Sequence, residues 1–246
     1  MLCDTLAASA APSNLRRRPI ALWLGALLTS TLLWDASGAD LPFMRLLGSS
    51  QGFALQHAWL LERVFHGGLR NVCLVFYLLM WVWALWPTRW QRALPEALAL
   101  PRRERLGVVL LVALSLLAVN LMKVNSLTSC PWELRNFGGQ ARYVSHWAIG
   151  QSDGGSGRCF PGGHASSAFA LIGLCLPWLA PPAGTTRQAS TGFRWLWLLL
   201  LVGVVAGAAQ TVRGAHFPSH TLWTLLICGG VSWAGWWLAL PRLALR

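Results

Sequence analysis

The sequence predicts an all-α polytopic membrane protein with six transmembrane helices. Of its 246 residues, 55% are hydrophobic and only 11% are charged, whereas a soluble domain carries about twice that charged fraction. Apolar stretches with almost no charge recur along the whole chain, at lengths near the roughly 20 residues that a membrane-spanning helix needs. No internal repeat divides the chain, so a single helical bundle is expected.

Six stretches have this apolar character, and each is expected to cross the membrane. Several are short for a span, so tilting or local thinning of the bilayer is expected. The six predicted spans are Pro19–Trp34, Asn71–Trp86, Leu106–Met122, Ala165–Ala180, Trp195–Val212 and Thr221–Leu240. They divide the chain into a tail at 1–18, a first span with an outer amphipathic segment at 19–70, a membrane domain at 71–240 and a second tail at 241–246.

The distribution of Lys and Arg predicts that both termini are cytoplasmic. The predicted inner segments carry twelve of the twenty Lys and Arg residues, and cytoplasmic loops are enriched in these residues. The net charge of +12 is explained by this topology and by attraction to anionic lipid head groups, so nucleic acid is not an expected partner.

The first span has two interpretations. Arg16, Arg17 and Arg18, the apolar core after them and the small residues Ala36 and Gly38 also fit a cleaved secretory signal. An uncleaved anchor is preferred, because the apolar run is longer than a usual signal core. In both cases the chain from residue 39 onward starts outside.

Most polar and turn-forming residues lie in three outer segments. Asp35–Arg70 has loosely spaced apolar residues, as in a helix that lies on the membrane, and its His57 and His66 are expected to be interfacial. Lys123–His164 holds the glycine-rich turns, and the third segment is the short stretch VRGAHFPSH. All three are expected at the same membrane face, where one pocket can form.

Three motifs in these outer segments carry a family resemblance. KVNSLTSCP contains Lys123 and Pro131, CFPGGH contains Pro161, Gly163 and His164, and QTVRGAHFPSH contains His216. In order and spacing they resemble the signature of the type 2 phosphatidic acid phosphatase superfamily, which reads K-x6-R-P, P-S-G-H and S-R-x5-H-x3-D. The resemblance covers the membrane core from about 106 to 240, and it implies a phosphatase-type helical bundle.

The chain departs from that signature at several positions. Cys130 and Gln210 stand where the first and third motifs have arginine, and His220 stands at the aspartate position. Gly162 replaces the serine of the second motif, which is a milder change because its backbone N–H remains. The departures affect the grip on phosphate and the orientation of the nucleophile.

The resemblance implies a role for each histidine. His216 would attack phosphorus to form a phosphohistidine, and His164 would protonate the leaving alkoxide and then activate water. His220 would hold His216 in the reactive tautomer. A carboxylate normally does this, and Glu133 or Asp153 from the outer loop is expected to supply the missing charge.

A phosphate dianion also needs positive charge and directed N–H groups. Lys123 offers an ammonium group. Arg158 and Arg213 offer planar forks that are expected to replace the two arginines that the motifs lack. Gly162 and Gly163, which directly precede a predicted helix, offer backbone N–H groups at the positive end of its dipole.

A zinc site is an alternative for the three motif histidines. Zinc accepts three protein nitrogens and a water, so His164, His216 and His220 form a possible ligand set. The chain lacks a helical pair of histidines four residues apart with a glutamate between them, and the family needs no metal. No metal and no cofactor are therefore expected.

Cys130 and Cys159 are expected to form a disulfide. They are the two cysteines of one outer loop, each beside a motif, and both motifs must meet around one phosphate. The outer compartment also permits disulfides.

These inferences predict an integral membrane phosphatase with a lipid phosphate as its substrate. The expected reaction is hydrolysis of a phosphomonoester or pyrophosphate of a phosphatidic acid-like, lipid A or polyprenyl lipid, at the periplasmic face of a bacterial inner membrane. A lipid-phosphate phosphotransferase and a catalytically inactive lipid-binding or transport protein remain alternatives. The pair of His164 and His216 favours an enzyme, because binding alone would need only the cations and the glycine turn.

Overall fold

The computed structural model describes residues 13–87, 89–90, 98–185 and 187–243, which form a bundle of long helices with almost no β-structure. The predicted all-α class is confirmed. The long helices are α1 (Ser13–Ser37), α3 (Leu69–Leu85), α4 (Arg102–Asn125), α7 (Ala189–Val212) and α8 (Pro218–Leu243). Parts of the two predicted tails, 1–12 and 244–246, lie outside the described residues.

The number of spans differs from the predicted six. Five helical segments of the described chain are long and apolar enough to cross a membrane, namely Arg18–Ser37, Leu60–Leu85, Arg102–Asn125, Ala189–Val212 and Pro218–Ala239. The predicted fourth span is a shorter helical segment, Gly163–Leu179. Its parts are α5 (Gly163–Phe169), the 3₁₀ helix η6 (Ala170–Cys175) and α6 (Leu176–Leu179).

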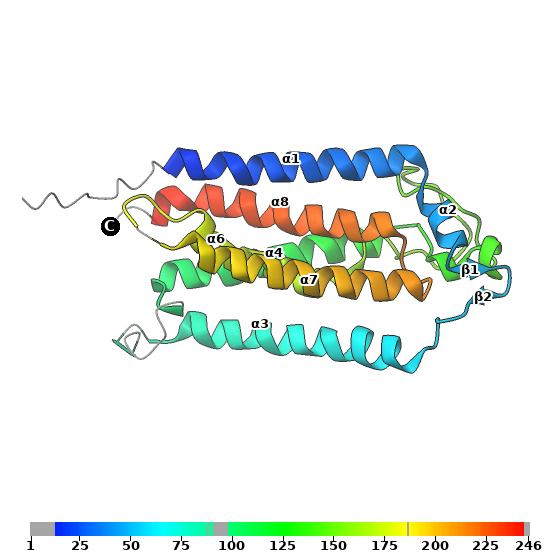
Figure 1. Cartoon of the computed structure of the whole chain (residues 1–246), viewed down its shortest axis with the longest axis horizontal. Helices are drawn as coiled ribbons and strands as arrows, with labels where there is room; N and C mark the ends of the chain where they lie inside the picture. Colours follow the sequence, from blue (N-terminus) through cyan, green and yellow to red (C-terminus); the bar gives the residue numbers. More distant parts are fainter. Residues whose placement is uncertain (1–12, 88, 91–97, 186, 244–246) are drawn as a thin grey trace, which may run out of the picture.

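This short segment, although not long enough to count as a span by itself, lies inside the bundle. Nearly all of its side chains are buried, and it contacts α4, α7 and α8. The 3₁₀ stretch rises about 2.0 Å per residue instead of about 1.5 Å, so the segment reaches further than an α-helix of equal length. As a result, α1 begins and α8 ends at the same end of the bundle (Figure 1). We call this end the inner end and the opposite end the outer end.

The second spanning segment begins earlier than predicted. Its helix starts at Leu60 rather than Asn71, because the π-helix η1 (Leu60–Gly68) continues directly into α3. Charged and polar side chains of η1 interrupt the apolar run, which hides this start in the sequence. The predicted surface helix of the first outer segment is also wrong, since α2 (Asp40–Arg45) is followed by an antiparallel pair of two-residue strands, β1 (Gly48–Ser49) and β2 (Gly52–Phe53).

Close helix contacts hold the bundle together. Gly203 on α7 faces Phe169, and a Cβ at this glycine would come within 2.1 Å of the phenylalanine ring. On α4, the buried Ser115 hydroxyl lies 3.3 Å from that of Ser232 on α8. Large apolar side chains of α1, α3, α4 and α7 remain exposed on the outside of the bundle, as expected for surfaces that face lipid.

The inner end is fixed by buried arginine contacts. Arg105 on α4 is fully buried and donates hydrogen bonds to the carbonyl oxygens of Trp83 and Trp86, where α3 ends. Arg187 forms a two-pronged ion pair with Glu104, with 2.9 Å between Nη2 and Oε1. These contacts lie at the opposite end from the three sequence motifs.

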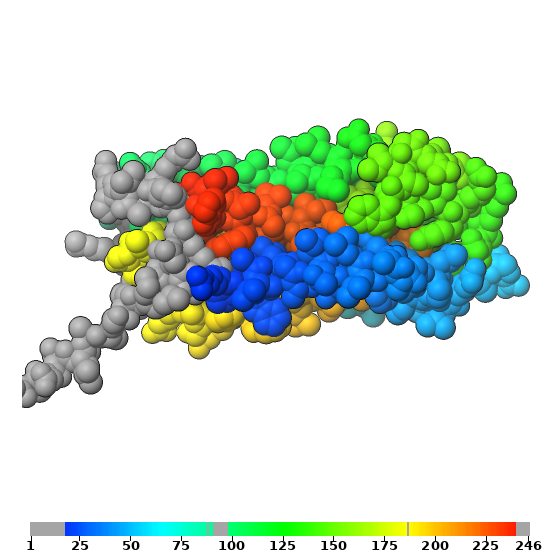
Figure 2. Space-filling view, turned by 90° about the horizontal axis from the view of Figure 1, so that it is seen from above, coloured from blue at the N-terminus to red at the C-terminus, as the bar shows by residue number. Residues whose placement is uncertain are grey.

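The outer end has a small core of its own. The segment between α4 and α5 contains the 3₁₀ turns η4 (Pro131–Glu133) and η5 (Arg135–Phe137), and it covers this end of the bundle (Figure 2). The buried apolar residues of this outer core are Met44, Phe53, Leu134, Phe137, Ala141 and Phe217. Gly214 has φ +78°, and a Cβ there would lie 2.3 Å from the Phe53 ring. This glycine therefore lets the loop before α8 pack against the hairpin.

Candidate active site

The three motifs meet at the outer end of the bundle. Lys123 lies in the last turn of α4, His164 in the first turn of α5 and His216 in the loop between α7 and α8. The ring centroids of His164 and His216 are 5.9 Å apart. The Lys123 side chain runs beside the α5 N-terminus, since a Cβ at Gly163 would lie 3.2 Å from its Nζ. Residues that are far apart in sequence thus form one polar cluster.

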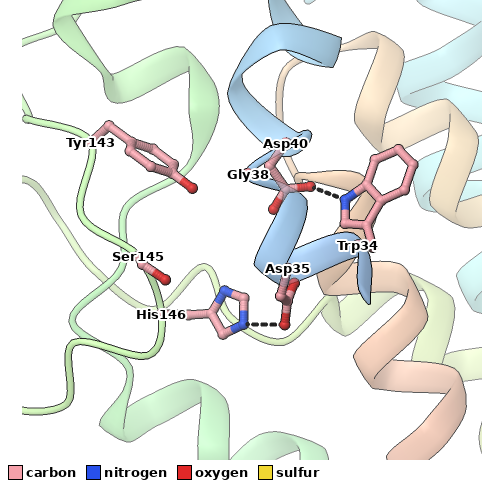
Figure 3. A pocket seen from close by; sticks show the side chains of 7 residues that line it. All are labelled: Trp34, Asp35, Gly38, Asp40, Tyr143, Ser145 and His146. Atoms are coloured by element: carbon pink, nitrogen blue, oxygen red, sulfur yellow. Dashed lines mark hydrogen bonds and ion pairs between the residues drawn. The ribbon is translucent and has the colours of Figure 1, made fainter. Parts of the chain in front are cut away.

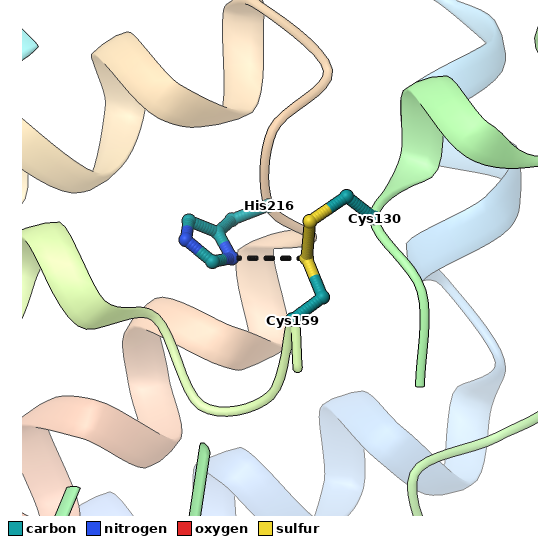
Figure 4. A group of neighbouring side chains, drawn as sticks. All are labelled: Cys130, Cys159 and His216. Carbon is teal, nitrogen blue, oxygen red and sulfur yellow. Dashed lines mark hydrogen bonds between the residues drawn. A yellow bond between two sulfur atoms is a disulfide. The ribbon is translucent and has the colours of Figure 1, made fainter. Parts of the chain in front are cut away.

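The Nδ1 atom of His216 has two close neighbours. It lies 3.4 Å from Nδ1 of His220 and 3.4 Å from Sγ of Cys159. Figure 4 shows the second ring nitrogen, Nε2, on the side of the imidazole away from the disulfide. A disulfide sulfur carries no proton, and a neutral imidazole has one bare nitrogen, so both neighbours can accept the Nδ1–H of His216. In that tautomer the Nε2 lone pair is available for nucleophilic attack.

The environment of His216 favours its neutral form. The residue is 3% exposed, and burial lowers its pKa well below the usual value, with further lowering by nearby His220, Lys123 and His164. An uncharged imidazole retains the lone pair that a nucleophile needs. The site therefore favours an uncharged His216 at neutral pH.

The N-terminus of α5 is held against α8. The amide of Gly162 donates to the carbonyl oxygen of His220 at 3.2 Å, and the Thr224 hydroxyl donates to the carbonyl oxygen of Gly162 at 3.1 Å. A Cβ at Gly162 would lie 3.3 Å from that His220 oxygen, so a residue without a side chain suits this close approach. The Gly162 N–H, expected to bind phosphate, is thus already occupied.

Arg213 is a buried cation that links four segments. Its Nε donates to the carbonyl oxygen of Gln56 at 2.9 Å, and Nη1 donates to Oε1 of Gln210 at 3.3 Å. Nη2 lies 3.8 Å from Oε2 of Glu62. The side-chain amide nitrogen of Gln210 is buried without a hydrogen-bond partner among the described residues. Arg213 also interacts electrostatically with His164, so it lies near the motif histidines, as the sequence predicted.

The structure adds His66, which was expected to be an interfacial residue. Its ring packs on that of His164 with centroids 4.0 Å apart, and Arg70 on the same helix interacts electrostatically with His164. Glu62, His66 and Arg70 follow one another at intervals of four residues. This spacing, which places side chains on one helical face, was the signal in the sequence that could have identified them.

Arg158 directly precedes Cys159 but points its side chain toward the surface. Its side chain is exposed, and its backbone has φ 59°. The charged groups that interact with His164 are Lys123, Arg70 and Arg213 together with His66. Arg158 is not among them, and its role in binding phosphate stays a prediction.

The two outer-loop carboxylates are engaged elsewhere. Glu133 accepts a hydrogen bond from the Cys130 amide at 2.8 Å. Asp153 accepts bonds from the Ser129 hydroxyl at 2.8 Å and from the Gly155 amide at 2.9 Å. Each orders the loop that carries it, and neither reaches His216 as the sequence led us to expect.

Cys130 and Cys159 are joined in a disulfide. Together with His216, they are the one group of three potential metal ligands found close together within the described part of the chain. Their two sulfur atoms are bonded to each other, so neither is a thiolate that could bind a metal ion. The zinc alternative based on the three histidines gains no support from this arrangement.

Comparisons with known proteins identify one family. The model described as the PAP2 superfamily matches residues 104–243, which is more than half of the chain and includes all three motifs. Searches of curated proteins and of solved structures gave no match. Asp35, Asp40, Glu62 and His66 lie outside the matched region.

Proposed function

Because the chain belongs to the PAP2 superfamily, we propose that it is an integral membrane lipid phosphatase that uses His216 as its nucleophile. The observation that carries this proposal is the pairing of His216 with His164, with ring centroids 5.9 Å apart. The cations Lys123 and Arg213 lie beside this pair. Two imidazoles with separate roles are what a two-step phosphoryl transfer requires.

In the first step, the Nε2 lone pair of His216 forms a bond to phosphorus. The bond between phosphorus and the lipid oxygen breaks, and His164 donates a proton to this leaving oxygen. Burial and then the charge of His66, Lys123, Arg70 and Arg213 lower the pKa of His164 to about 3, so this proton must arrive with the bound lipid phosphate, whose negative charge raises that pKa. The phosphorylated imidazole keeps its proton on Nδ1, and this N–H donates a hydrogen bond to Nδ1 of His220 at 3.4 Å. His220 thereby takes the orienting role of the aspartate in the family signature.

In the second step, water attacks the phosphohistidine. His164, now neutral, accepts a proton from the water as the oxygen bonds to phosphorus and the bond to His216 Nε2 breaks. Inorganic phosphate leaves and both histidines return to their starting states. No metal ion is required by this sequence of proton transfers.

Positive charge around His164 supports binding of a phosphate dianion. Lys123 and Arg213 act on His164 together with Arg70. His216 is 3% exposed whereas His164 and Lys123 are half-buried. The phosphate would therefore approach His216 past these two half-buried groups, which could bind it on the way.

Apolar surface beside the cluster supports a lipid substrate. Leu60 and Val64 are exposed on η1, and Leu121 and Met122 are exposed on α4 next to Lys123. A lipid whose phosphate lies beside Lys123 would place its acyl or prenyl chain against these residues. The excess of Lys and Arg in the inner segments supports our proposal that the outer end faces the periplasm of a bacterium and that the helices cross its inner membrane.

The test is phosphate release by the purified protein in detergent, with a chelator present, over a panel of phosphatidic acid, lipid A phosphate and polyprenyl pyrophosphate. His216→Ala is expected to abolish release. His57→Ala is the matched control, because His57 is exposed at the same end and belongs to no described contact of the cluster. Release that persists in His216→Ala would contradict the mechanism, and no release from any lipid by the wild type would favour an inactive binding protein.

A further inference from the structure

The partner of His216 is itself held by residues outside the family-matched region. His220 is fully buried, and besides His216 three aromatic rings lie edge-on to its ring. The centroid distances are 6.0 Å to His146, 5.2 Å to Phe160 and 5.3 Å to Phe217. Because an imidazole accepts a hydrogen bond through one nitrogen only, its orientation must be fixed if it is to replace a carboxylate.

Asp40 fixes the backbone at His220. Its Oδ1 accepts a hydrogen bond from the Ser219 amide at 3.1 Å, and its Oδ2 accepts one from the Ser219 hydroxyl. Ser219 lies in the first turn of α8 directly before His220. A carboxylate at this place satisfies a free N–H of the helix and interacts favourably with the helix dipole, so Asp40 acts as a cap supplied by another segment.

Asp35 fixes the side chains around His220. Its Oδ2 accepts hydrogen bonds from His146 at 3.2 Å, Trp147 at 3.0 Å and Trp223 at 2.8 Å. Trp223 lies three residues after His220 on α8, and the His146 ring stacks on Phe160 with centroids 4.2 Å apart. One carboxylate therefore anchors His146, which contacts the His220 ring, and Trp223, which packs against His146 and Phe160.

The two carboxylates come from a single corner of the fold. Asp35 lies near the end of α1 and Asp40 begins α2. Figure 3 shows both carboxylates among the residues that line a small cavity, with Asp35 in contact with His146 and Asp40 in contact with Trp34. The cavity has a volume of about 10 Å³, close to the space that one water needs. Both carboxylates are nearly buried.

We propose that Asp35 and Asp40, at the α1–α2 corner, are positioning residues of the active centre and hold His220 so that its Nδ1 accepts the Nδ1–H of His216. This inference rests on the proposed function. The required tautomers place one proton on Nδ1 of His216 and one on Nε2 of His220, and this Nε2 is buried without a hydrogen-bond partner among the described residues. The corner thereby does indirectly, through His220, what the missing aspartate of the third motif would do by direct contact.

The first measurement is kcat and KM for Asp35→Asn and Asp40→Asn, with a lipid phosphate that the wild type hydrolyses. A misplacement of about 1 Å at a catalytic group costs roughly 100-fold in rate, so kcat is expected to fall about 10- to 100-fold while KM changes less than about twofold. Glu104→Gln is the matched control. Glu104 is also a buried, hydrogen-bonded carboxylate, but it lies at the inner end, and its variant is expected to keep wild-type kcat.

The second measurement separates positioning from a purely structural role. His220→Asp would place a carboxylate directly beside His216, so the loss caused by Asp35→Asn should shrink to about twofold in this background. An equal loss from Asp35→Asn in both backgrounds would overturn the inference, as would unchanged kcat in the two single variants. If Asp40→Asn does not fold, the comparison of Asp35→Asn in the two backgrounds decides alone.

The same experiment separates this inference from the proposed function. Wild-type turnover with unaffected corner variants would overturn the inference and leave the phosphatase intact. If the wild type binds phosphate but shows no turnover, both the proposed function and this inference are overturned.

Discussion

Removal of the Cys130–Cys159 disulfide should weaken the outer end of the protein. The two cysteines are separated by 29 positions, so the bridge closes a loop of about 30 residues. The chain-entropy relation for this loop length gives a stabilisation of about 3.6 kcal/mol. For a chain of this size, such a loss lowers the unfolding temperature by on the order of 10 °C.

Reduction should also slow the reaction. The Cys159 sulfur lies 3.4 Å from Nδ1 of His216, and in the disulfide it can only accept a hydrogen bond. The free thiol would carry a proton that it can donate to Nδ1. This favours the tautomer whose Nε2 is protonated and cannot attack phosphorus, so kcat is expected to fall by about tenfold or more.

The assay is thermal unfolding in detergent with and without a phosphine reductant, beside a count of thiols in denaturant. The chain has six cysteines and two are in the bridge, so four thiols should label before reduction and six after it. Six labelled thiols without reductant, or an unfolding temperature that reductant leaves unchanged, would refute the reasoning.

Three further predictions follow from the geometry. Arg213→Lys keeps the charge but loses the planar fork, so kcat/KM for lipid phosphate hydrolysis should fall about 10- to 100-fold; a ratio within twofold of wild type would contradict the proposed role. Gly203→Val should destabilise the bundle by about 1–3 kcal/mol in thermal unfolding, because its Cβ would meet Phe169 at 2.1 Å; Gly230→Val, with open space at its Cβ, is the control. Burial lowers the pKa of His216, so below about pH 6.5 the unfolded chain binds a proton that the folded chain does not, and stability should fall as pH falls; a His216→Gln variant with an equally steep dependence would contradict this.

The sequence is informative where helix ends carry the chemistry. Lys123, His164 and His216 each stand within a few residues of the end of an apolar stretch. Lys123 and His164 flank the same outer loop, and two predicted spans lie between His164 and His216, so all three are expected at one membrane face. The meeting of Lys123, His164 and His216 at the outer end could therefore be predicted from hydropathy and spacing. The family followed from the same residues, and the match to residues 104–243 confirms it.

Contacts between distant segments could not be predicted in this way. Asp35 bonds Trp223 and Asp40 bonds Ser219 across almost the whole chain, and hydropathy does not specify which helices are neighbours in a bundle. For the same reason the sequence pointed to Glu133 and Asp153, the carboxylates nearest to the motifs along the chain. In the structure both form hydrogen bonds within their own loop.

The start of the second spanning segment was missed for a different reason. The π-helix η1 carries Glu62 and His66, and Arg70 follows at the start of α3, so the hydropathy of this stretch resembles that of an outer loop. These polar side chains are tolerated there because Glu62 pairs with Arg213 and His66 packs on His164. Their partners come from α5 and from the end of α7, and a single segment read alone does not reveal them.

The central claim is that His216 carries the phosphoryl group, and trapping that intermediate tests it most directly. The protein would be mixed with a lipid phosphate, quenched in alkali within one turnover and digested for mass spectrometry. The account predicts one phosphoryl group on the peptide that contains His216, present in His57→Ala and absent in His216→Ala. Turnover without any phosphorylated histidine, or a phosphoryl group on another residue, would contradict it.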